Sequence, residues 1–439
     1  MTAWRNRLIG AAIGIAIAAV WLARQSTHAP ASGWNVLPED AGSLQTIALQ
    51  YTKAAGPDIR PPYRAFLSAI DPSTSVIAVC GDQADAVDLD NFLRSCPECH
   101  GDRVRKVVVG APITAWCKDR FLVTGSTPAA LLTPKPPVTG LAGRDNDAQV
   151  AAAIARAFPG RFRVVPTGMY FDSGDIVATP TRLIVSDSLW RKNAGNPVSL
   201  SSTSRTAHRP VGPVPPGLGV RGSDFGPSIA SPAPLSLEGR GGGGEGHPGI
   251  LGRSAGSNSS PSRFGRGGEE RTGVGSFDRT LAAEFGRRVV HLHGVPDHHI
   301  GMFAAPLDDR TVIVGDPSMA RPLWNPTLDH ALGKADFSPR IDALFSNAAA
   351  ELRAAGFRVI RAPLVYFGPQ EYLTYTNAVL ETRGGRRIVY MPSYDVPALD
   401  DLGRDAYESA GWQVRPIPVR TLYRYRGTIG CLINVLQRG

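Results

Sequence analysis

The sequence predicts an α/β fold, and two observations indicate it. Short apolar runs of strand length alternate along the chain with longer amphipathic stretches of helical period. The 439 residues are 43% hydrophobic and 19% charged, which is typical of a globular protein and not of a disordered one. A chain of this length can bury a large core and form one to three domains.

The elements before residue 196 follow one another in a regular order. Residues 32–60 are expected to be a lead-in, and 61–195 the first part of the folded domain. STSVIAVCG (73–81) has the composition of a buried strand, and QADAVDLDNFLRS (83–95) that of a helix. Further strands are expected over 106–112 and 161–168, a helix over 148–158, and two strands joined by a turn over 176–187.

Residues 196–275 break this pattern. Gly, Pro, Ser and Arg dominate them, as in EGRGGGGEGHPG, and no apolar periodicity is present. We interpret them as a disordered insertion, because they have too little apolar surface to bury and a packed loop of this length is uncommon. Since strands and helices continue on both sides, we expect a loop excursion within one domain.

The second part of the domain is expected over 276–439. Helices are predicted over 276–288, 341–357 and 399–412, and strands over 289–295, 310–317, 358–364 and 412–419. A hairpin is predicted from 375–382 and 386–394 across Arg383-Gly384-Gly385. The chain then ends with a strand that directly follows Cys431.

The N-terminus has the pattern of an export signal. Arg5 and Arg7 precede an apolar run from Leu8 to Ala23. The run is short for a membrane span, which needs about 20 residues, but long enough for the apolar region of a signal peptide. Ala29-Pro30-Ala31 is a small-residue cleavage site made poor by its proline. We therefore expect 1–31 to be a signal peptide or membrane anchor, and the protein to be exported, either membrane-anchored or periplasmic or extracellular.

The positive charge does not predict a nucleic-acid partner. The net charge is +9 and the pI is about 9.5. Arginine supplies most of this charge and is scattered rather than clustered into a stripe with interleaved aromatic residues. We interpret it as solvated surface, with nucleic-acid binding as the weaker alternative.

The cysteine count predicts a free thiol. The five cysteines are Cys80, Cys96, Cys99, Cys117 and Cys431, so at most two disulfides can form. CPECH (96–100) also fits the C-x-x-C-H pattern of covalent haem attachment. No haem pocket is evident around this short pattern, so a local disulfide between Cys96 and Cys99, or two free thiols, is preferred.

Cys431 lies in a glycine-flanked turn of the final stretch, TIGCLINVLQRG. A thiol held there is either a nucleophile or a small hydrophobe at a strand edge. Three other stretches carry candidate partners: AWCKDRFLV with Trp116 and Asp119, YFDSGDIVAT with Asp172 and Asp175 around Gly174, and PDHHIGMFAAPLDD with His298 and His299. Taken singly these are weak signals, because such aspartates usually cap turns and such histidines are usually structural.

In this order the four stretches resemble the guanidino-group-modifying, or pentein, superfamily. The order is W-x-x-D, acid-x-G-D/N, H-x-D-M-F and G-x-x-x-C, and it is closest to agmatine deiminase and bacterial peptidylarginine deiminase-like proteins. DSGDIVATPTRLIVSDS (172–188) also resembles a segment of dimethylarginine dimethylaminohydrolase. The resemblance covers roughly 61–195 and 277–438. It implies an α/β propeller of five ββαβ-type units around a pseudo-fivefold axis.

The resemblance also implies a chemistry and a role for each residue. Carboxylates are the bidentate partners of a guanidinium group, so Asp119 and Asp172 would hold the substrate, with Asp175 and Trp116 beside it. Cys431 would attack the central guanidinium carbon and form a covalent thiouronium, and His299 would act as general acid and then as general base. No metal or organic cofactor is implied. The substrate would be agmatine, arginine, or a methylated or peptidyl arginine.

The sequence departs from the family pattern at three positions. Gly301 replaces the aspartate of H-x-D, Gly430 replaces a histidine often found before the cysteine, and Ser173 replaces the first glycine of the acid-Gly-Gly segment. Losing one charge-assisted contact costs about 2–3 kcal/mol, or roughly a hundredfold in affinity, if nothing replaces it. A cysteine-dependent amidinohydrolase or deiminase is therefore the leading prediction. A catalytically silent guanidino-binding domain and an amidinotransferase are its alternatives.

Overall fold

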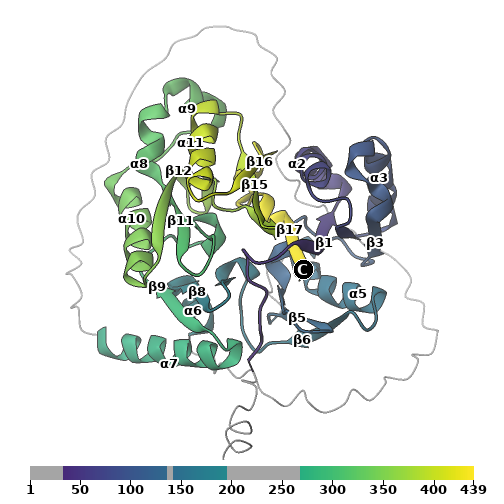
Figure 1. Cartoon of the computed structure of the whole chain (residues 1–439), viewed down its shortest axis with the longest axis horizontal. Helices are drawn as coiled ribbons and strands as arrows, with labels where there is room; N and C mark the ends of the chain where they lie inside the picture. Colours follow the sequence, from purple (N-terminus) through teal and green to yellow (C-terminus); the bar gives the residue numbers. More distant parts are fainter. Residues whose placement is uncertain (1–32, 136–141, 195–266) are drawn as a thin grey trace, which may run out of the picture. The chain divides into compact units, whose positions relative to one another are not determined.

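The fold is a mixed α/β architecture built from several small sheets (Figure 1). The computed structural model describes residues 33–135, 142–194 and 267–439. The strands are β1 (Leu44–Tyr51), β2 (Ser75–Cys80), β3 (Val104–Val108), β4 (Leu122–Val123), β5 (Ala129–Thr133), β6 (Phe162–Pro166), β7 (Val177–Ala178), β8 (Arg182–Ser186), β9 (Arg288–Leu292), β10 (Ala304–Pro306), β11 (Thr311–Asp316), β12 (Arg358–Gly368), β13 (Glu371–Thr374), β14 (Val379–Arg383), β15 (Arg386–Ser393), β16 (Gln413–Pro418) and β17 (Ile433–Arg438). The helices are α2 (Gly56–Ala69), α3 (Gln83–Arg94), α4 (Ala142–Asn146), α5 (Val150–Ala157), α6 (Asp187–Asn193), α7 (Gly267–Phe285), α8 (Pro317–Ala320), α9 (Pro326–Leu332), α10 (Pro339–Ala354), α11 (Pro397–Glu408) and α12 (Ile429–Leu432).

Within the described residues the same three-stranded arrangement occurs five times. The sheets are ordered β17-β1-β2-β3, β4-β5-β6, β7-β8-β9, β10-β11-β12-β13 and β14-β15-β16. In each, one strand pairs antiparallel with one neighbour and parallel with the other, as β5 does with β4 and β6. A parallel pair needs a crossover connection, and helices such as α5 and α11 supply it. The strand, helix and strand units predicted on both sides of the Gly-rich segment are thus the repeating element of the fold.

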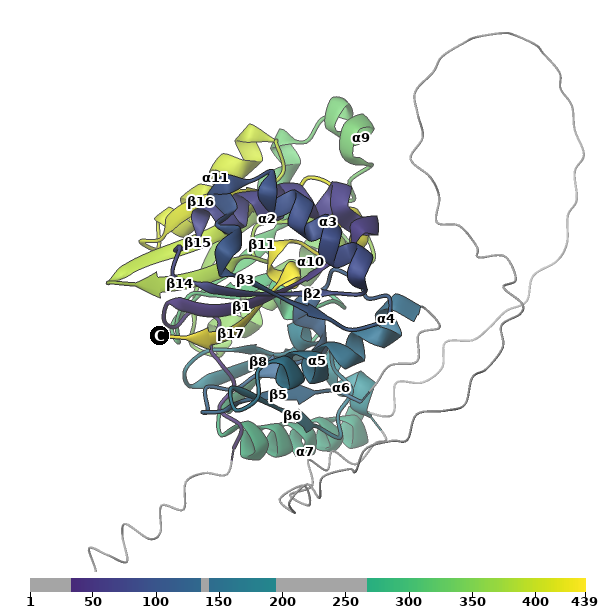
Figure 2. The same ribbon diagram turned by 90° about the vertical axis from the view of Figure 1, so that its right-hand side faces the viewer.

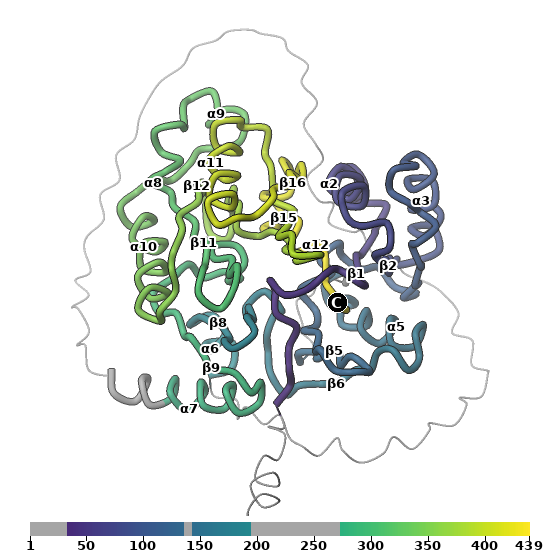
Figure 3. Tube along the Cα trace, in the orientation of Figure 1, coloured from purple at the N-terminus to yellow at the C-terminus, as the bar shows by residue number. Residues whose placement is uncertain are grey.

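The two ends of the described chain meet in one sheet. β1 pairs antiparallel with β17, with Leu49 opposite Ile433, and parallel with β2. Figure 3 shows the C-terminal end of the chain beside β1. Residues 32–60, expected to be a lead-in, therefore contain β1 and the start of α2. This strand is difficult to predict from the sequence LQTIALQY, because polar residues interrupt its apolar ones, although all but one of its eight residues are buried.

The β17-β1-β2-β3 sheet is covered on both faces (Figure 2). Leu49 and Val76 pack with Phe66 of α2 on one face, whereas Ile77 and its neighbours pack with Ile154 of α5 on the other. Burial on both faces explains why VIAVC is apolar without alternation.

Most predicted elements before residue 196 are confirmed. The strands over 73–81 and 161–168 are β2 and β6, and the helices over 83–95 and 148–158 are α3 and α5. The two strands across a turn in 176–187 are β7 and β8, which pair antiparallel. The strand expected over 106–112 lies slightly earlier, as β3, because the chain turns at Gly110, whose φ is +89°.

The second part of the domain differs mainly at its beginning. The helix expected over 276–288 is α7, which begins nine residues earlier, at Gly267, so the proposed insertion does not extend to residue 275. Four glycines in this stretch lower its helix propensity and conceal the start of the helix. Phe277, Leu281 and Phe285, spaced by four residues and buried, anchor the part that the sequence predicts. The predicted hairpin is β14 and β15, with Arg383 opposite Arg386.

Two predicted segments fall where the structure gives no description. Residues 1–31, expected to be a signal peptide or membrane anchor, and most of 196–275, expected to be disordered, lie outside the described residues. Among the residues that are described, no helix is both long and apolar enough to cross a membrane.

The cysteines divide into one disulfide and three free thiols. Cys96 and Cys99 form the disulfide, which is the local pairing preferred over haem attachment. Cys80 and Cys117 are buried, and burial raises the pKa of Cys80 to about 12 and that of Cys117 still further. Cys431 is the remaining free thiol.

Candidate active site

The six residues selected from the sequence line one pocket of about 590 Å³. They are Trp116, Asp119, Asp172, Asp175, His299 and Cys431. Each comes from a short helical turn or from the residue just before one, and each turn lies next to a strand. The sheets thus hold four distant segments of the sequence at one place.

Asp119 belongs to a 3-10 turn, η4 (Cys117–Arg120), that directly precedes β4. Its side chain is buried, and Trp116 immediately precedes the turn. Cys117 packs into the core beneath, which fixes the turn and leaves Asp119 and Trp116 at the pocket.

Asp172 precedes and Asp175 ends a second 3-10 turn, η6 (Ser173–Asp175), which lies just before β7. The backbone N–H of Asp172 donates to Asp175 Oδ2 at 2.9 Å, which closes the turn. Gly174 is required here by close approach. A Cβ at Gly174 would lie 2.6 Å from Cγ of His299, far inside contact distance. The glycine of the acid-x-G-D pattern therefore makes room for the histidine ring.

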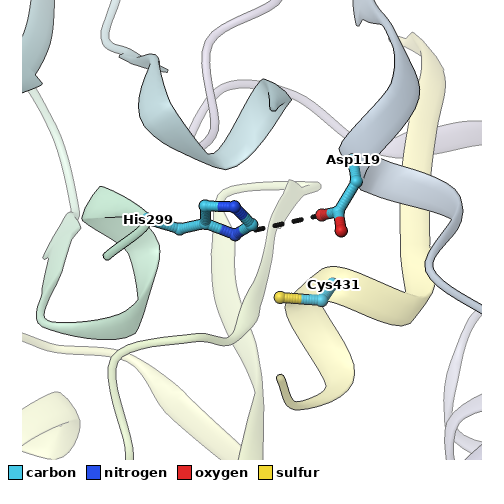
Figure 4. A group of neighbouring side chains, drawn as sticks. All are labelled: Asp119, His299 and Cys431. Carbon is cyan, nitrogen blue, oxygen red and sulfur yellow. Dashed lines mark ion pairs between the residues drawn. The ribbon is translucent and has the colours of Figure 1, made fainter. Parts of the chain in front are cut away.

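His299 and Cys431 face each other across the pocket. His299 precedes the turn η8 (Ile300–Met302), which two buried apolar side chains anchor. Cys431 lies in the single turn α12, and its N–H donates to the Thr428 carbonyl at 3.1 Å. The Cys431 sulfur, a His299 ring nitrogen and an Asp119 carboxylate oxygen lie within 4.8 Å of one another (Figure 4). A thiol, an imidazole and a carboxylate at this spacing can carry nucleophilic catalysis, and the same three atoms could ligate a metal ion.

The environment of His299 favours its charged form. Burial alone lowers the pKa of His299, but Asp172, Cys431, Asp119 and Asp175 raise it, and the net pKa lies well above its usual value. The Nε2 atom of His299 is 3.6 Å from Asp172 Oδ2, and its Nδ1 atom is 3.9 Å from Asp119 Oδ1. Burial raises the pKa of Asp172, yet contact with His299 and nearby cations hold that pKa well below its usual range. His299 is thus a proton donor and Asp172 a carboxylate near neutral pH.

The structure separates the two adjacent histidines. His298 also lines the pocket, with its ring centroid 5.1 Å from that of His299. Burial and the neighbouring charge of His299 lower the pKa of His298 well below its usual value. His298 is therefore neutral beside a cationic His299, a difference that the dipeptide alone does not reveal.

Three cations that the sequence analysis missed already pair with these carboxylates. Arg144, in α4, donates from Nη1 to Asp119 at 2.8 Å and from Nη2 to Asp172 at 3.2 Å. Its guanidinium therefore bridges the two carboxylates expected to hold a guanidinium substrate. No local pattern around Arg144 signals this role, because α4 is a five-residue helix that precedes a longer one.

Lys192 and Arg120 complete the charge pairing. Lys192 Nζ lies 2.6 Å from Asp175 Oδ2 and 3.1 Å from Asp172 Oδ2. Arg120, which is 3% exposed, lies 3.3 Å from Asp172. Lys192 lies on α6, 17 residues after the DSGD segment. This spacing places it near the aspartates in the sequence but does not indicate that it pairs with them. The pocket thus presents neutralised carboxylates rather than an open negative receptor.

Asn377 occupies the space beside the two unusual glycines. A Cβ at Gly301 would lie 3.1 Å from Asn377 Nδ2, and one at Gly430 would lie 2.9 Å from Oδ1 and 3.1 Å from the Asn377 carbonyl carbon. The Thr428 hydroxyl donates to Asn377 Oδ1 at 2.6 Å, and the Cys431 thiol donates to the same atom at 3.4 Å. The hairpin segment YTNAVLE thus supplies an amide that orients the thiol where larger family side chains are absent.

Comparisons with known proteins agree on the fold. No family model and no curated protein sequence matches the chain. Among solved structures, C. jejuni agmatine deiminase aligns with a TM-score of 0.57 at 12% identity, over 92% of this chain and 96% of that chain. A form of that enzyme with substrate bound gives a TM-score of 0.56 at 12% identity and the same coverage. A protein provisionally described as a peptidyl-arginine deiminase gives 0.55 at 13% identity, over 92% of this chain and 99% of that chain.

Sequence identities this low do not indicate the substrate of this chain, but the alignments span nearly the whole of each chain. Together with the repeated sheet arrangement and the order of the four segments at the pocket, they show that this chain has the fold of the guanidino-group-modifying, or pentein, superfamily.

Proposed function

We propose that the protein is a cysteine-dependent hydrolase that cleaves a C–N bond of a guanidino compound. The observation that carries this proposal is the meeting of the Cys431 sulfur, a His299 ring nitrogen and an Asp119 carboxylate oxygen within 4.8 Å of one another. They meet in a pocket that Asp172 and Asp175 also line.

The carboxylates address the main chemical difficulty. A guanidinium carbon is a poor electrophile, because resonance stabilises the group and spreads its positive charge. A substrate guanidinium that displaces Arg144 donates charge-assisted hydrogen bonds to Asp119 and Asp172, which fix its carbon in front of the sulfur. The bound cation also favours the thiolate form of Cys431.

The reaction then proceeds through a covalent intermediate. The Cys431 thiolate forms an S–C bond to the central carbon while a C=N electron pair moves onto nitrogen. The C–N bond to the leaving amine breaks as His299 gives that nitrogen its proton, which leaves an S-linked thiouronium. His299 next removes a proton from water, the hydroxide adds to the carbon, and the C–S bond breaks to restore the thiolate. The net reaction converts a guanidinium and water into a ureido group and an ammonium.

Agmatine, free arginine, methylated arginine and peptidyl arginine are the candidate substrates. The agmatine deiminase and the provisional peptidyl-arginine deiminase that share this fold support this set.

A silent guanidino-binding domain is the second candidate function. Its support is Arg144, which already bridges Asp119 and Asp172, and the loss of two polar side chains at Gly301 and Gly430. In this alternative the pocket holds a guanidinium without transforming it.

A charged electrophile tests the guanidinium receptor and the nucleophile even while the substrate is unidentified. The full-length chain is treated with 2-chloroacetamidine, an amidinium that mimics the guanidinium, and with neutral 2-chloroacetamide of nearly the same size. We expect the amidinium to alkylate Cys431 at least tenfold faster, since only a charged reagent can displace Arg144 and pair with Asp119 and Asp172 beside the sulfur. Cys431→Ser abolishes the modification. Equal rates for the two reagents would contradict the proposed receptor and nucleophile.

We further propose that the five sheets are the blades of a five-bladed propeller. The strand arrangement that is repeated five times supports this proposal.

We also propose that the protein is exported. The basic-flanked apolar run at residues 8–23 and the Cys96–Cys99 disulfide support export, because disulfides persist in oxidising compartments.

A further inference from the structure

A second group of metal-ligating side chains lies outside the pocket described above. We propose that Asp187, His291 and His293 bind a Zn²⁺ ion. One ligand atom of each lies within 4.8 Å of the other two. None of the three residues lines the pocket of Cys431 and His299.

The paired ends of two strands bring these residues together. β8 and β9 are parallel neighbours, with Ser186 opposite Leu292. Asp187 follows β8 directly as the first residue of α6, and His293 follows β9. His291 and His293 are two residues apart, so their side chains leave the extended chain on the same side.

The distances suit one shared ion. Asp187 Oδ1 lies 3.3 Å from His291 Nε2 and 2.8 Å from His293 Nδ1. Ligands about 2.0–2.2 Å from a tetrahedral Zn²⁺ are about 3.3–3.6 Å from one another. Small side-chain adjustments would therefore place all three atoms around an ion.

His291 supplies an independent indication of a ligand. Its side chain is 4% exposed, and its buried Nε2 makes no hydrogen bond, although Asp187 Oδ1 lies 3.3 Å away. Its other nitrogen, Nδ1, lies 2.8 Å from Asp278 of α7. A carboxylate on the far nitrogen is the usual support for a metal-bound histidine, since it fixes the tautomer that points a lone pair at the metal.

The other donor atoms already face one another, because His293 Nδ1 and Asp187 Oδ1 share a hydrogen bond of 2.8 Å, which a bound ion would replace. The two imidazole rings stack at 4.5 Å with an interplanar angle of 11°. Asp187 Oδ2 accepts the Gly294 N–H at 3.0 Å, which leaves Oδ1 directed at the two histidines.

The donor set selects the metal. Two imidazoles and one carboxylate suit Zn²⁺, whereas Ca²⁺ and Mg²⁺ require oxygen ligands. His293 is half exposed, so a water molecule can reach the fourth position. The ion would tie α6, which precedes residues 195–266, to β9, which follows them, with Asp278 of α7 as its outer support.

The test uses the full-length chain with the Cys431→Ser substitution, which removes the thiol from the only other ligand group found among the described residues. After chelation, Zn²⁺ is titrated by calorimetry, and bound metal is counted after gel filtration. We expect about one ion per chain and a rise in melting temperature on Zn²⁺ addition. His293→Gln, at a half-exposed position, should abolish stoichiometric binding without unfolding the protein. Asp278→Asn should weaken binding about 10–100-fold.

His330→Gln, at an exposed histidine of α9, is the matched control and should bind as the parent does. Co²⁺ in place of Zn²⁺ should give the intense visible absorption of a four-coordinate site, which His291→Gln removes. Zn²⁺ binding that survives His293→Gln and His291→Gln unchanged would overturn the proposal, as would the failure of the folded parent to bind Zn²⁺. Neither result bears on the cysteine chemistry, because every variant already lacks Cys431.

Discussion

At the scale of single residues, the absence of a side chain at Gly174 decides where His299 lies. A Cβ there would be 2.6 Å from Cγ of the ring and 2.7 Å from Nδ1. Gly174→Ala must therefore displace the ring from Asp119, Asp172 and Cys431. We expect turnover to fall about a hundredfold, because misplacement of a catalytic group by about 1 Å has this effect. Gly368→Ala, where an added Cβ meets nothing within 4 Å, is the control. Equal activity of the two variants would show that the ring position does not matter.

Arg144 is the residue that most directly sets access to the carboxylates. A guanidinium ligand must displace it from Asp119 and Asp172, and hydrogen bonds to charged groups contribute about 1.5–3 kcal/mol each. We expect Arg144→Gln in the Cys431→Ser protein to bind agmatine or arginine at least about tenfold more tightly. Calorimetry measures the dissociation constant. Arg191→Gln, on an exposed ion pair with Asp297, should leave it unchanged. Weaker binding by Arg144→Gln would instead make Arg144 part of the ligand's own support.

At the scale of elements, α7 depends on one apolar stripe. Phe277, Leu281 and Phe285 pack into a core with Leu183, Val185 and Leu189. Leu281→Ala leaves a cavity at a fully buried position, and we expect the free energy of unfolding to fall by about 2–5 kcal/mol. Urea denaturation of this variant and of Arg279→Ala, at an exposed position of the same helix, measures the difference. An equal loss in both would mean that the stripe does not anchor the helix.

The elements also show what the sequence can and cannot predict. α3, α5 and the β14–β15 hairpin were predictable, because period and turn residues agree along each of them. β1 was not, because Thr46 and Gln50 are buried polar residues whose partners lie far away in the sequence: Gln437 for Thr46, and Thr114 and Asp147 for Gln50. The start of α7 was hidden by its glycines.

The pocket likewise combines residues that the sequence indicates with residues that it does not. Cys431, His299 and the three aspartates could be proposed from the order of four short motifs. Arg144, Lys192 and Asn377 could not, because each acts through a tertiary contact that no local spacing encodes. The sequence thus predicted residues that meet at one pocket but not the charged side chains that already pair with them.

At the scale of the whole molecule, the charges at the pocket should shape stability as a function of pH. The pKa of Asp172 is lowered, so its contribution is present above about pH 3.9 and is lost as pH falls towards its lowered folded value. The pKa of His299 is raised, so its contribution is present below about pH 6.5 and is lost as pH rises through its folded value. We expect His299→Gln to remove the decline in the free energy of unfolding above about pH 6.5. Urea denaturation across pH values measures this, and an unchanged alkaline limb would contradict the assignment.

Product release tests whether Cys431 carries the hydrolysis of a guanidino group. The full-length protein is incubated with agmatine, arginine, methylated arginines and an arginine peptide, and ammonia, released amines and ureido products are quantified. We expect turnover of at least one compound, with a ureido product, and complete loss of that turnover in Cys431→Ser. Turnover that persists in Cys431→Ser, or no turnover of any compound by folded wild-type protein, would contradict it and favour a domain that only binds guanidino ligands.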